Sequence, residues 1–560
     1  MEIRDTYLRF LVDDVQRNLE RFDEDTGRFM TGDGWAVTNQ DIVYPLALLY
    51  TTAESPYYGD ERILRHALRG ADAWRDFQYP DGRVEFVKVD GSRWGPTYMP
   101  WSMYHWLETY ALLHDQLDPA RRSRWEKGLT LAYDGIAGEL ARGHVHNIPT
   151  WNGMAAYRAG VVFGRPEWQE AGRQMIALAV DAQTPHGYWL EHHGPTTLYN
   201  LVYTHAIGLY HVFSGDESVL PCLERATDFH IRYTYPDGRV LETIDGRVKY
   251  HDRVSDFAHT TFSLFPQGRR YVRMLVENMD ADRQVRTEPR ISHVVTSGSL
   301  RIASAEYGLS PQLASAYVHL RSGPEAPIPH DRPAYQIHDQ GHALIRRGQG
   351  WFYCLSAVVT PPVESRWGQD RSNYLSIWHE GTGLIVGGGN SKGQPEWSTF
   401  AVGEGADAAF LPTAAELRTD AGRDAIALSY GDPAQAGKTC ILAVQVVSRK
   451  CIELQLTGAE RVPSVAHLML KIGPEKPLRT GAGCTLALDG RPIDLDSDAS
   501  GGWIAWDGWR LTVPAGSRFQ WPVLPFNPYT ADGAAPLDEA AGILTVPLEA
   551  ETRVLRLLID

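Results

Sequence analysis

The first half of the chain carries apolar residues at helical spacing. Near the N-terminus they recur every three or four positions, in a stripe made of Ile3, Tyr7, Phe10, Leu11, Val15, Leu19 and Phe22. This spacing gives an amphipathic helix one apolar face. Similar stripes predict further helices over 40–52, 61–78, 99–116, 120–141, 152–163, 166–182, 197–213, 217–233 and 259–278.

The connectors between these helices resemble one another. YPDGRV occurs at 79–84 and again at 235–240, and the connectors are marked by Gly27, Gly82, Gly143, Gly187 and Gly238, which are 44 to 61 residues apart. A repeat of about 50 residues with two helices is typical of helical hairpins that stack to bury their apolar faces. We predict an (α/α) toroid over 1–285, incomplete or closed, with five to six hairpins and equivalent loops on one face. An extended solenoid is the alternative.

After about residue 290 the pattern changes to short segments rich in β-branched and aromatic residues. Gly, Asn, Asp and Pro separate segments such as HVVTSGSLRIAS, NYLSIWHEGTGLIVGGG and WRLTVPAG. This texture is typical of antiparallel strands, and their number implies stacked sheets. The sequence therefore predicts a multidomain chain, α then β, with an antiparallel β-sandwich over 290–560.

Composition and charge limit the function classes. The chain is 43% hydrophobic and 22% charged, with a net charge of −15, which argues against nucleic-acid or polybasic membrane binding but permits an anionic substrate held by local Arg and His. No apolar stretch is long enough to span a membrane. The start, MEIRDTYLRF, lacks a signal-peptide pattern, so we expect a cytoplasmic protein or one whose leader has been removed. The five cysteines are expected to be reduced and mostly buried.

Polar residues with catalytic potential concentrate on three connectors. The third connector carries His144, His146 and Asn147, the fourth carries Glu191, His192 and His193 ahead of Tyr199 and Tyr203, and the fifth carries Arg247, Tyr250, His251, Asp252 and Arg253. In a toroid, equivalent loops would bring these residues to one cleft.

The layout resembles polysaccharide lyases built from an (α/α) toroid and an antiparallel β-domain, namely the chondroitin AC, hyaluronate and xanthan lyases and the heparinase II/III-like enzymes. The resemblance rests on Asn147 in HNIPTW, on His192 and Tyr199 in HGYWLEHHGPTTLY, and on the arginines of DGRVKYHDR. The gap from His192 to Tyr199 is shorter than the family's, so Tyr203 competes with Tyr199, and the arginine loop has two extra residues. In GQDRSNYLSIW, Gln369 and Arg371 stand where heparinase-like enzymes have histidines, which argues against a heparinase-type metal site.

This resemblance implies β-elimination from a uronate. Tyr199 would take the C5 proton and could return it to the leaving oxygen, His192 or His193 would assist, and Asn147 with Arg253 would neutralise the carboxylate. Because a free tyrosine has a pKa of about 10, such a base needs cations beside it. The remaining substrate-binding candidates are Arg247, Trp151, Trp189, Tyr203, His251, Arg371 and Trp35.

The expected substrate is an anionic oligosaccharide or polysaccharide, and the product a 4,5-unsaturated uronate. Glucuronate as the sugar and exo action are expectations from the family alone. We predict no cofactor and no metal: His338 and His342 are four residues apart, but in a strand-rich stretch that spacing does not place them on one face. The sequence leaves the oligomeric state open.

Two other functions compete with the lyase. An inverting glycoside hydrolase would need two carboxylates about 6.5–9.5 Å apart, for which the candidates are Asp33, Asp41, Glu85, Glu191 and Asp252. A non-catalytic carbohydrate-binding protein would need only aromatic platforms. Each site residue also has a structural interpretation: Tyr199, Tyr203 and Tyr210 are near helical spacing and could be packed aromatics, and the loop arginines could form salt bridges.

Overall fold

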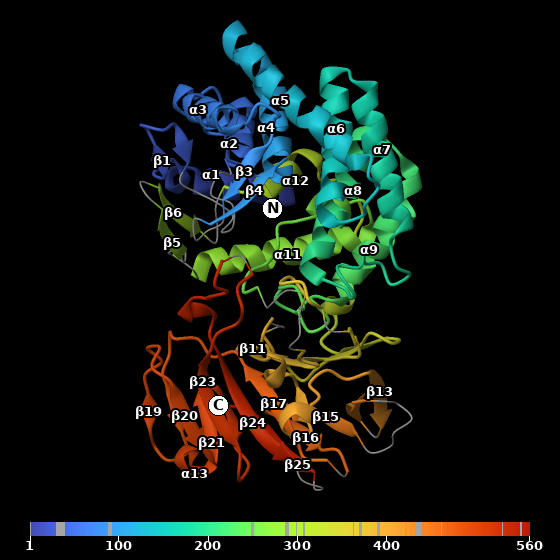
Figure 1. Ribbon diagram of the computed structural model, residues 1–560, viewed down its shortest axis with the longest axis vertical. Helices are drawn as coiled ribbons and strands as arrows, with labels where there is room; N and C mark the ends of the chain where they lie inside the picture. Colours follow the sequence, from blue (N-terminus) through green and yellow to red (C-terminus); the bar gives the residue numbers. More distant parts are fainter. Residues whose placement is uncertain are drawn as a thin grey trace.

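The structure is a computed structural model of the 560-residue chain. It describes residues 2–560 apart from 30–39, 88–91, 248–250, 286–290, 298–299, 306–308, 362, 369–371, 389–391, 421, 432–437, 461, 529 and 549–551. Helices form one body and the long sheets form a second body stacked against it (Figure 1). Strand pairs in the described part of the first 305 residues are antiparallel. The predicted helical toroid followed by an antiparallel β-sandwich is confirmed.

Six helices make a closed inner ring, in which each contacts the next and the last contacts the first. They are α2 (Val43–Thr51), α4 (Pro100–Leu113), α6 (Asn147–Phe163), α8 (Thr197–Ser214), α10 (His259–Phe262) and α12 (Pro311–His319). Packed around the ring are α1 (Ile3–Leu19), α3 (Glu61–Phe77), α5 (Pro119–Leu140), α7 (Pro166–Asp181), α9 (Leu220–Arg232) and α11 (Pro266–Val285). An inner helix such as α4 is buried along most of its length, whereas α3 buries one stripe only, as expected for a two-layered ring.

The ring is closed by a helix that the sequence analysis did not predict. Helix α12 follows a hairpin of β5 (Ile291–Ser297) and β6 (Leu300–Ala305), yet it packs on α1, α2 and α10. Leu309, Leu313 and Ile328 belong to the same hydrophobic core as the other helices. The helical body therefore extends beyond the predicted boundary at 285, and α12 with α1 forms a sixth hairpin from distant parts of the chain.

The two YPDGRV segments fold into the same turn. The amide of Tyr79 donates to the carbonyl of Arg83 at 2.8 Å, and the amide of Tyr235 donates to the carbonyl of Arg239 at 2.8 Å. Gly82 has φ +86, and a side chain there would lie 2.7 Å from the backbone of Leu131. Only glycine suits this conformation and this close approach. The turn therefore fixes how the connector lies on α5, the outer helix of the next hairpin.

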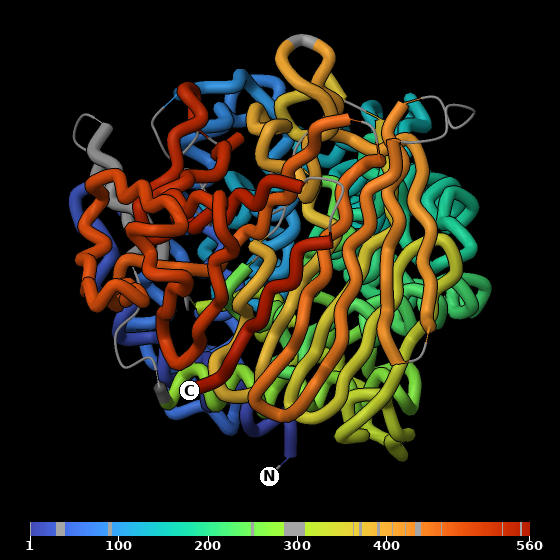
Figure 2. Tube along the Cα trace, turned by 90° about the horizontal axis from the view of Figure 1, so that it is seen from below, coloured from blue at the N-terminus to red at the C-terminus, as the bar shows by residue number. Residues whose placement is uncertain are grey.

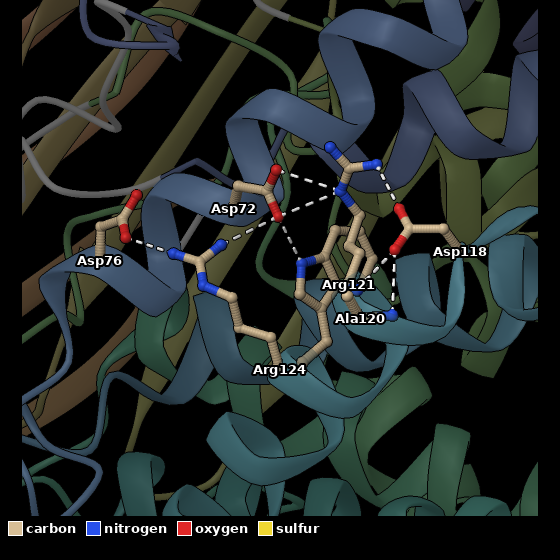
Figure 3. A network of polar contacts seen from close by, with 7 residues as sticks. Asp72, Asp76, Asp118, Ala120, Arg121 and Arg124 are labelled. Carbon is tan, nitrogen blue, oxygen red and sulfur yellow. Dashed lines mark hydrogen bonds and ion pairs between the residues drawn. The ribbon is translucent and has the colours of Figure 1, made fainter.

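A polar network ties the outer helices α3 and α5 together (Figure 3). The carboxylate of Asp72 accepts hydrogen bonds from Arg121 at 3.1 Å, Arg124 at 3.2 Å and the indole of Trp125 at 2.8 Å. Asp118 caps the start of α5 by accepting from two backbone amides of its first turn. These contacts satisfy the indole N–H of Trp125, whose ring is fully buried.

The second body consists of two stacked antiparallel sheets. In the described residues the first runs β20 (Ile493–Asp496), β23 (Arg518–Val523), β24 (Ala541–Leu548), β17 (Ser464–Leu470), β11 (Gly383–Val386), β10 (Leu375–His379), β9 (Trp351–Ser356), β8 (Ala343–Gly348) and β7 (Tyr335–Asp339), with β12 (Phe400–Val402) also on β17. The second runs β13 (Ala414–Asp420), β14 (Arg423–Ser429), β15 (Thr439–Ser448), β16 (Cys451–Thr457), β25 (Arg553–Ile559), β22 (Trp509–Thr512), β21 (Trp503–Trp506), β18 (Leu478–Thr480) and β19 (Thr485–Leu486). Viewed from the sandwich end, the strands lie across the helices (Figure 2).

Strands β9 and β10 of the first sheet are buried on both faces, because one face covers the sandwich core and the other meets the toroid. Along β9, Tyr353 packs into the sandwich core, whereas its neighbour Phe352 packs against toroid residues such as Phe229 and Tyr235. Successive side chains of a strand point to opposite faces. A strand with apolar side chains on both faces can therefore contribute to two hydrophobic cores. The indole of Trp378 in β10 donates to Asp237 of the toroid at 2.8 Å.

Two further observations concern the whole chain. In the part that the structure describes, no helix is long and apolar enough to cross a membrane. Cys222, Cys354 and Cys440 are buried free thiols, Cys451 is half-buried and Cys484 is exposed.

Candidate active site

The loop between α7 and α8 forms a tight turn that presents two histidines. The amide of Glu191 donates to the carbonyl of Gly194 at 3.1 Å, and the side chains of His192 and His193 between them are exposed. His192 adopts φ +62, a left-handed conformation that costs a non-glycine residue about 1–2 kcal/mol. Strain of this kind is often kept where function requires it.

Behind this turn lies the buried carboxylate of Glu191. It contacts donor groups from helices α6 and α8 and from two connectors. One oxygen accepts from Asn147 at 2.9 Å and from the hydroxyl of Tyr203 at 3.0 Å. The other lies 3.1 Å from His146 Nε2 and 2.5 Å from a guanidinium nitrogen of Arg247. We call these five residues the Glu191 cluster. Asn147 begins α6 and Tyr203 lies on α8, so the inner ring fixes the cluster.

The electrostatics of the cluster favour an ionised glutamate. Burial alone would raise the pKa of Glu191, but the hydrogen bond and charge of His146, the charge of Arg247 and the hydrogen bond of Asn147 outweigh it and lower the pKa to about 2. The pKa of Tyr203 is raised, first by burial and then by the negative charge of Glu191. Glu191 is therefore a fixed negative charge that holds its neighbours in place.

Arg247 joins the cluster to a row of aromatic rings. Its guanidinium carbon lies 3.8 Å from the ring centroid of Tyr199, a half-buried residue in the first turn of α8, and 5.3 Å from that of Trp367. Trp367 meets Trp94 edge to face, with centroids 5.0 Å apart. Trp94 belongs to β4 (Arg93–Thr97), which pairs with β3 (Val84–Val87), and Trp94 stacks on Phe86. We call Tyr199, Arg247, Trp367 and Trp94 the aromatic row.

The burial of His192 also bears on the chemistry. Partial burial and then the positive charge of Arg247 lower the pKa of His192. Near neutral pH this imidazole is therefore mainly uncharged, and an uncharged imidazole can accept a proton.

The sandwich supplies the facing wall. A small cavity at the junction is lined by residues 243–246 of the toroid body and by Ser356, Val358, Thr360, Ser372, Asn373 and Tyr374 of the sandwich. Asp245, on the toroid side of this cavity, accepts hydrogen bonds from the hydroxyl of Thr197 at 3.1 Å and the backbone amide of Arg247 at 2.7 Å. This cavity therefore lies between the two bodies, with Asn373 on its sandwich side.

The structure thus brings together Asn147, Tyr203, Arg247 and Tyr199 from three of the predicted connectors. Arg253 is exposed and His251 is half-buried, and their approach to Tyr199 stays a prediction. Trp35 and Arg371 lie outside the described residues. The site assignment as a whole remains a prediction about chemistry, resting on this geometry.

Two predicted aromatic platforms are instead core residues. Trp151 is fully buried and donates its indole N–H to the carbonyl of Pro100 at 3.2 Å. Trp189 is also buried and stacks on Tyr203, with centroids 4.9 Å apart. Neither ring offers a face to a sugar in this structure, so their role as platforms is not supported; Trp189 instead packs against Tyr203 of the cluster.

The carboxylates proposed for a hydrolase are committed to other partners. Asp41 accepts from Ser102 at 2.6 Å, Glu85 accepts from the amide of Gly95 at 2.8 Å, and Asp252 pairs with Arg239 at 2.8 Å. Asp33 lies outside the described residues. The low pKa of Glu191 is the opposite of what a general acid needs.

The pKa of another carboxyl group, that of Glu242, is shifted in the opposite direction, but this group is buried. Burial raises the pKa of Glu242 to about 7. Its oxygens accept from Tyr235 at 2.9 Å and from the amide of Gly388 at 3.0 Å, and the residue is only 3% exposed.

Two contributions were missed by sequence reasoning. Trp367 was not singled out, because it sits in the β-half, far from the repeat loops. His146 was noted as a loop residue without a role. Its place beside Asn147, at the start of a helix in the third connector, was the available signal, since the first turn of a helix faces the loop side. In the described residues one group of two histidines and an aspartate could hold a metal, and its His186 lies in the α7–α8 loop ahead of Glu191.

Comparisons with known proteins agree with this architecture. No family model matches the chain, and no curated protein sequence does. Among solved structures, the crystal structure of heparinase III matches with 12% identity over 100% of this chain and 85% of that chain, with a TM-score of 0.53. Chondroitin AC lyase from Streptomyces coelicolor A3 has 12% identity over 100% and 82%, and a TM-score of 0.47. The baculovirus envelope protein ODV-E66, a chondroitin lyase, has 11% identity over 100% and 84%, and a TM-score of 0.42.

The chain has the fold of heparinase III. At these identities the likeness concerns the arrangement of toroid and sandwich and carries no side-chain roles. Those roles rest on the contacts of the Glu191 cluster and the aromatic row.

Proposed function

We propose that this chain is a polysaccharide or oligosaccharide lyase that cleaves a uronate-containing glycan by β-elimination and leaves a 4,5-unsaturated uronate. The observation that carries the proposal is the position of Tyr199. Its ring lies against the guanidinium of Arg247, at the edge of a cluster that also contains Asn147. A phenol, a cation and an amide at one cleft are the groups that elimination next to a carboxylate requires.

The substrate carboxylate would be neutralised at Arg247 and the first turn of α6. Abstraction of the C5 proton places a second negative charge on the carboxylate, which donors fixed in advance can stabilise. Arg247 is held by Glu191 and by its own backbone bond to Asp245. Asn147 is buried to 2% exposure, and the positive end of the α6 dipole lies beside it. Arg253, exposed on the same connector as Arg247, would be a further cation for the bound chain.

Proton transfer would be performed by Tyr199. The guanidinium of Arg247 lies against its ring, and the same hydroxyl can return the proton to the leaving oxygen. His192, mainly uncharged near neutral pH and exposed on the strained turn, would accept or relay the proton together with His193. Tyr203 is the weaker candidate because its hydroxyl already donates to Glu191 and its pKa is raised.

The aromatic row supports exo action on a glycan end, whereas glucuronate as the uronate is proposed from the family resemblance alone. Trp94 of the toroid meets Trp367 of the sandwich next to Arg247. This contact bridges the two bodies at one side of the cleft, so a chain would enter as an end more easily than it would pass through. The faces of such rings pack well against sugar rings.

The product decides between the lyase and its rivals. Incubation with a panel of uronate glycans should produce near-ultraviolet absorbance from the unsaturated uronate. The same reaction in heavy-oxygen water should leave the product unlabelled, because elimination adds no water. A saturated, labelled product would overturn the proposal in favour of a hydrolase, and binding without any product would favour a carbohydrate-binding protein.

A further inference from the structure

Three potential metal ligands from distant parts of the chain meet where the toroid rests on the first sheet. His186 lies in the loop after α7, whereas Asp339 ends β7 and His342 begins the return towards β8. Nδ1 of His186 is 3.1 Å from Oδ1 of Asp339. One ligand atom from each residue lies within 4.8 Å of the other two.

The two oxygens of Asp339 have different surroundings. Oδ2 accepts a hydrogen bond from Tyr233 at 2.8 Å and lies 3.3 Å from Arg232. Oδ1 faces His186 instead. In protein metal sites a carboxylate is commonly oriented in this way, with one oxygen turned to the ion and the other held by neighbouring donors.

The two imidazoles are packed close together beside Asp339. The ring centroids of His186 and His342 are 3.7 Å apart. Neutral imidazoles beside a carboxylate are the ligand forms that a zinc ion binds.

We propose that His186, Asp339 and His342 bind one divalent transition-metal ion, zinc in the first instance, which fastens the loop after α7 to the β7–β8 turn. Two histidines and an aspartate are a ligand set that zinc accepts. Tetrahedral ligands at zinc bond lengths stand about 3.3 Å apart, so small side-chain rotations would draw the three atoms together. The hydroxyl of Tyr188, 2.9 Å from Nε2 of His342, or solvent would complete the coordination.

The sequence analysis predicted no metal here because it paired His342 with His338. His338 lies on β7 next to Asp339, but its side chain is exposed and it is not part of the group of three ligands. The true partner, His186, is 153 residues away from Asp339 in the chain. Only the stacking of toroid on sheet brings the ligands together.

The test uses the full-length protein, stripped with a chelator and titrated with zinc alone against a chromophoric competitor. One equivalent should bind and raise the Tm, and cobalt in its place should give the visible absorption of tetrahedral coordination. His186→Gln and His342→Gln should each lower zinc affinity by about 100-fold or more, whereas His338→Gln should match the wild type.

Failure of the stripped wild type to take up zinc or cobalt would overturn the proposal, and so would unchanged affinity in both glutamine variants. If a variant does not fold, chemical modification of histidines in the wild type supplies the answer. Zinc should protect His186 and His342 from modification while leaving His338 reactive, and equal reactivity of all three would again overturn the site. None of these readouts depends on lyase activity.

Discussion

At the scale of the residue, the proton-transfer role of Tyr199 is the first prediction. Tyr199→Phe keeps the ring that lies 3.8 Å from Arg247 but removes the hydroxyl. Turnover should fall by a factor of about 100 or more, the usual scale for a lost acid–base group, with the Tm nearly unchanged. Initial rates of near-ultraviolet absorbance measure this change.

The matched control is Tyr58→Phe, since Tyr58 is 61% exposed on a loop between two helices. It should have wild-type turnover. Full activity in Tyr199→Phe would exclude this tyrosine as the base and move attention to Tyr203 and the paired histidines.

Two buried glutamates make opposite predictions about pH. The folded pKa of Glu191 is lowered from 4.5 to about 2. Between these values the unfolded chain binds more protons, so this group's stabilisation is complete above pH 4.5 and is lost as the pH falls towards 2. The folded pKa of Glu242 is raised from 4.5 to about 7. There the folded chain binds more protons, so stability falls as the pH rises from 4.5 to 7.

Urea unfolding at several pH values tests this contrast. At pH 8, Glu191→Gln should lower the free energy of unfolding and Glu242→Gln should raise it, each by about 3 kcal/mol because one pKa unit corresponds to about 1.4 kcal/mol. At pH 4 the Glu242→Gln variant should lose its advantage over the wild type. The same sign of change at pH 8 in both variants would contradict this account.

Glu191 shows how much of the candidate site could be predicted from the sequence. The repeat of helical hairpins placed Asn147, Glu191 and Arg247 on neighbouring loops, and the structure brings them into contact. The sequence could not tell that Glu191 is the shared acceptor, because that depends on the direction of each side chain. Burial of Trp151 and Trp189 was likewise invisible, since a tryptophan near a loop can point to either side.

At the scale of the element, the connector glycines carry a prediction. Gly82 and Gly59 both have positive φ, at +86 and +68, but their surroundings differ. Backbone atoms lie within 2.8 Å of the point where a methyl group added to Gly82 would sit, whereas the same point at Gly59 has no neighbour within 4 Å. Gly59→Ala should cost about 1 kcal/mol for conformation alone. Gly82→Ala should cost about 3 kcal/mol, because α5 must also shift.

Chemical denaturation of the two alanine variants measures this difference. Equal losses would mean that the connector does not rest on α5 in the way described. The same reasoning explains what the repeat could reveal from sequence: it marked the positive-φ connectors, whose role is local. It could not reveal α12, whose nine residues close the ring through contacts with α1 and α2 at the other end of the chain.

At the scale of the whole molecule, the junction of the two bodies is the feature that sequence patterns describe least. The strands β9 and β10 were expected as strands, but an apolar run does not say what covers each face. In the structure Phe352 and Trp378 pack against the toroid, and Arg247 of the toroid meets Trp367 of the sandwich at the same junction. The stability of this junction and the geometry of the site should therefore change together.

The final prediction compares two buried phenylalanines of the sandwich. Phe352 faces the toroid and Phe519 faces the sandwich core, and both are 0% exposed. Replacing either with alanine should cost about 3–5 kcal/mol. Only Phe352→Ala should loosen the junction, so it should split a single calorimetric transition into two. It should also reduce turnover at temperatures well below the melting range of the variant. Phe519→Ala should lower the Tm while keeping turnover per folded molecule. If both variants lost stability alike and kept full turnover, the site would be independent of the junction, and Arg247, Trp367 and Trp94 would have to be held by the toroid loops and the β3–β4 hairpin alone.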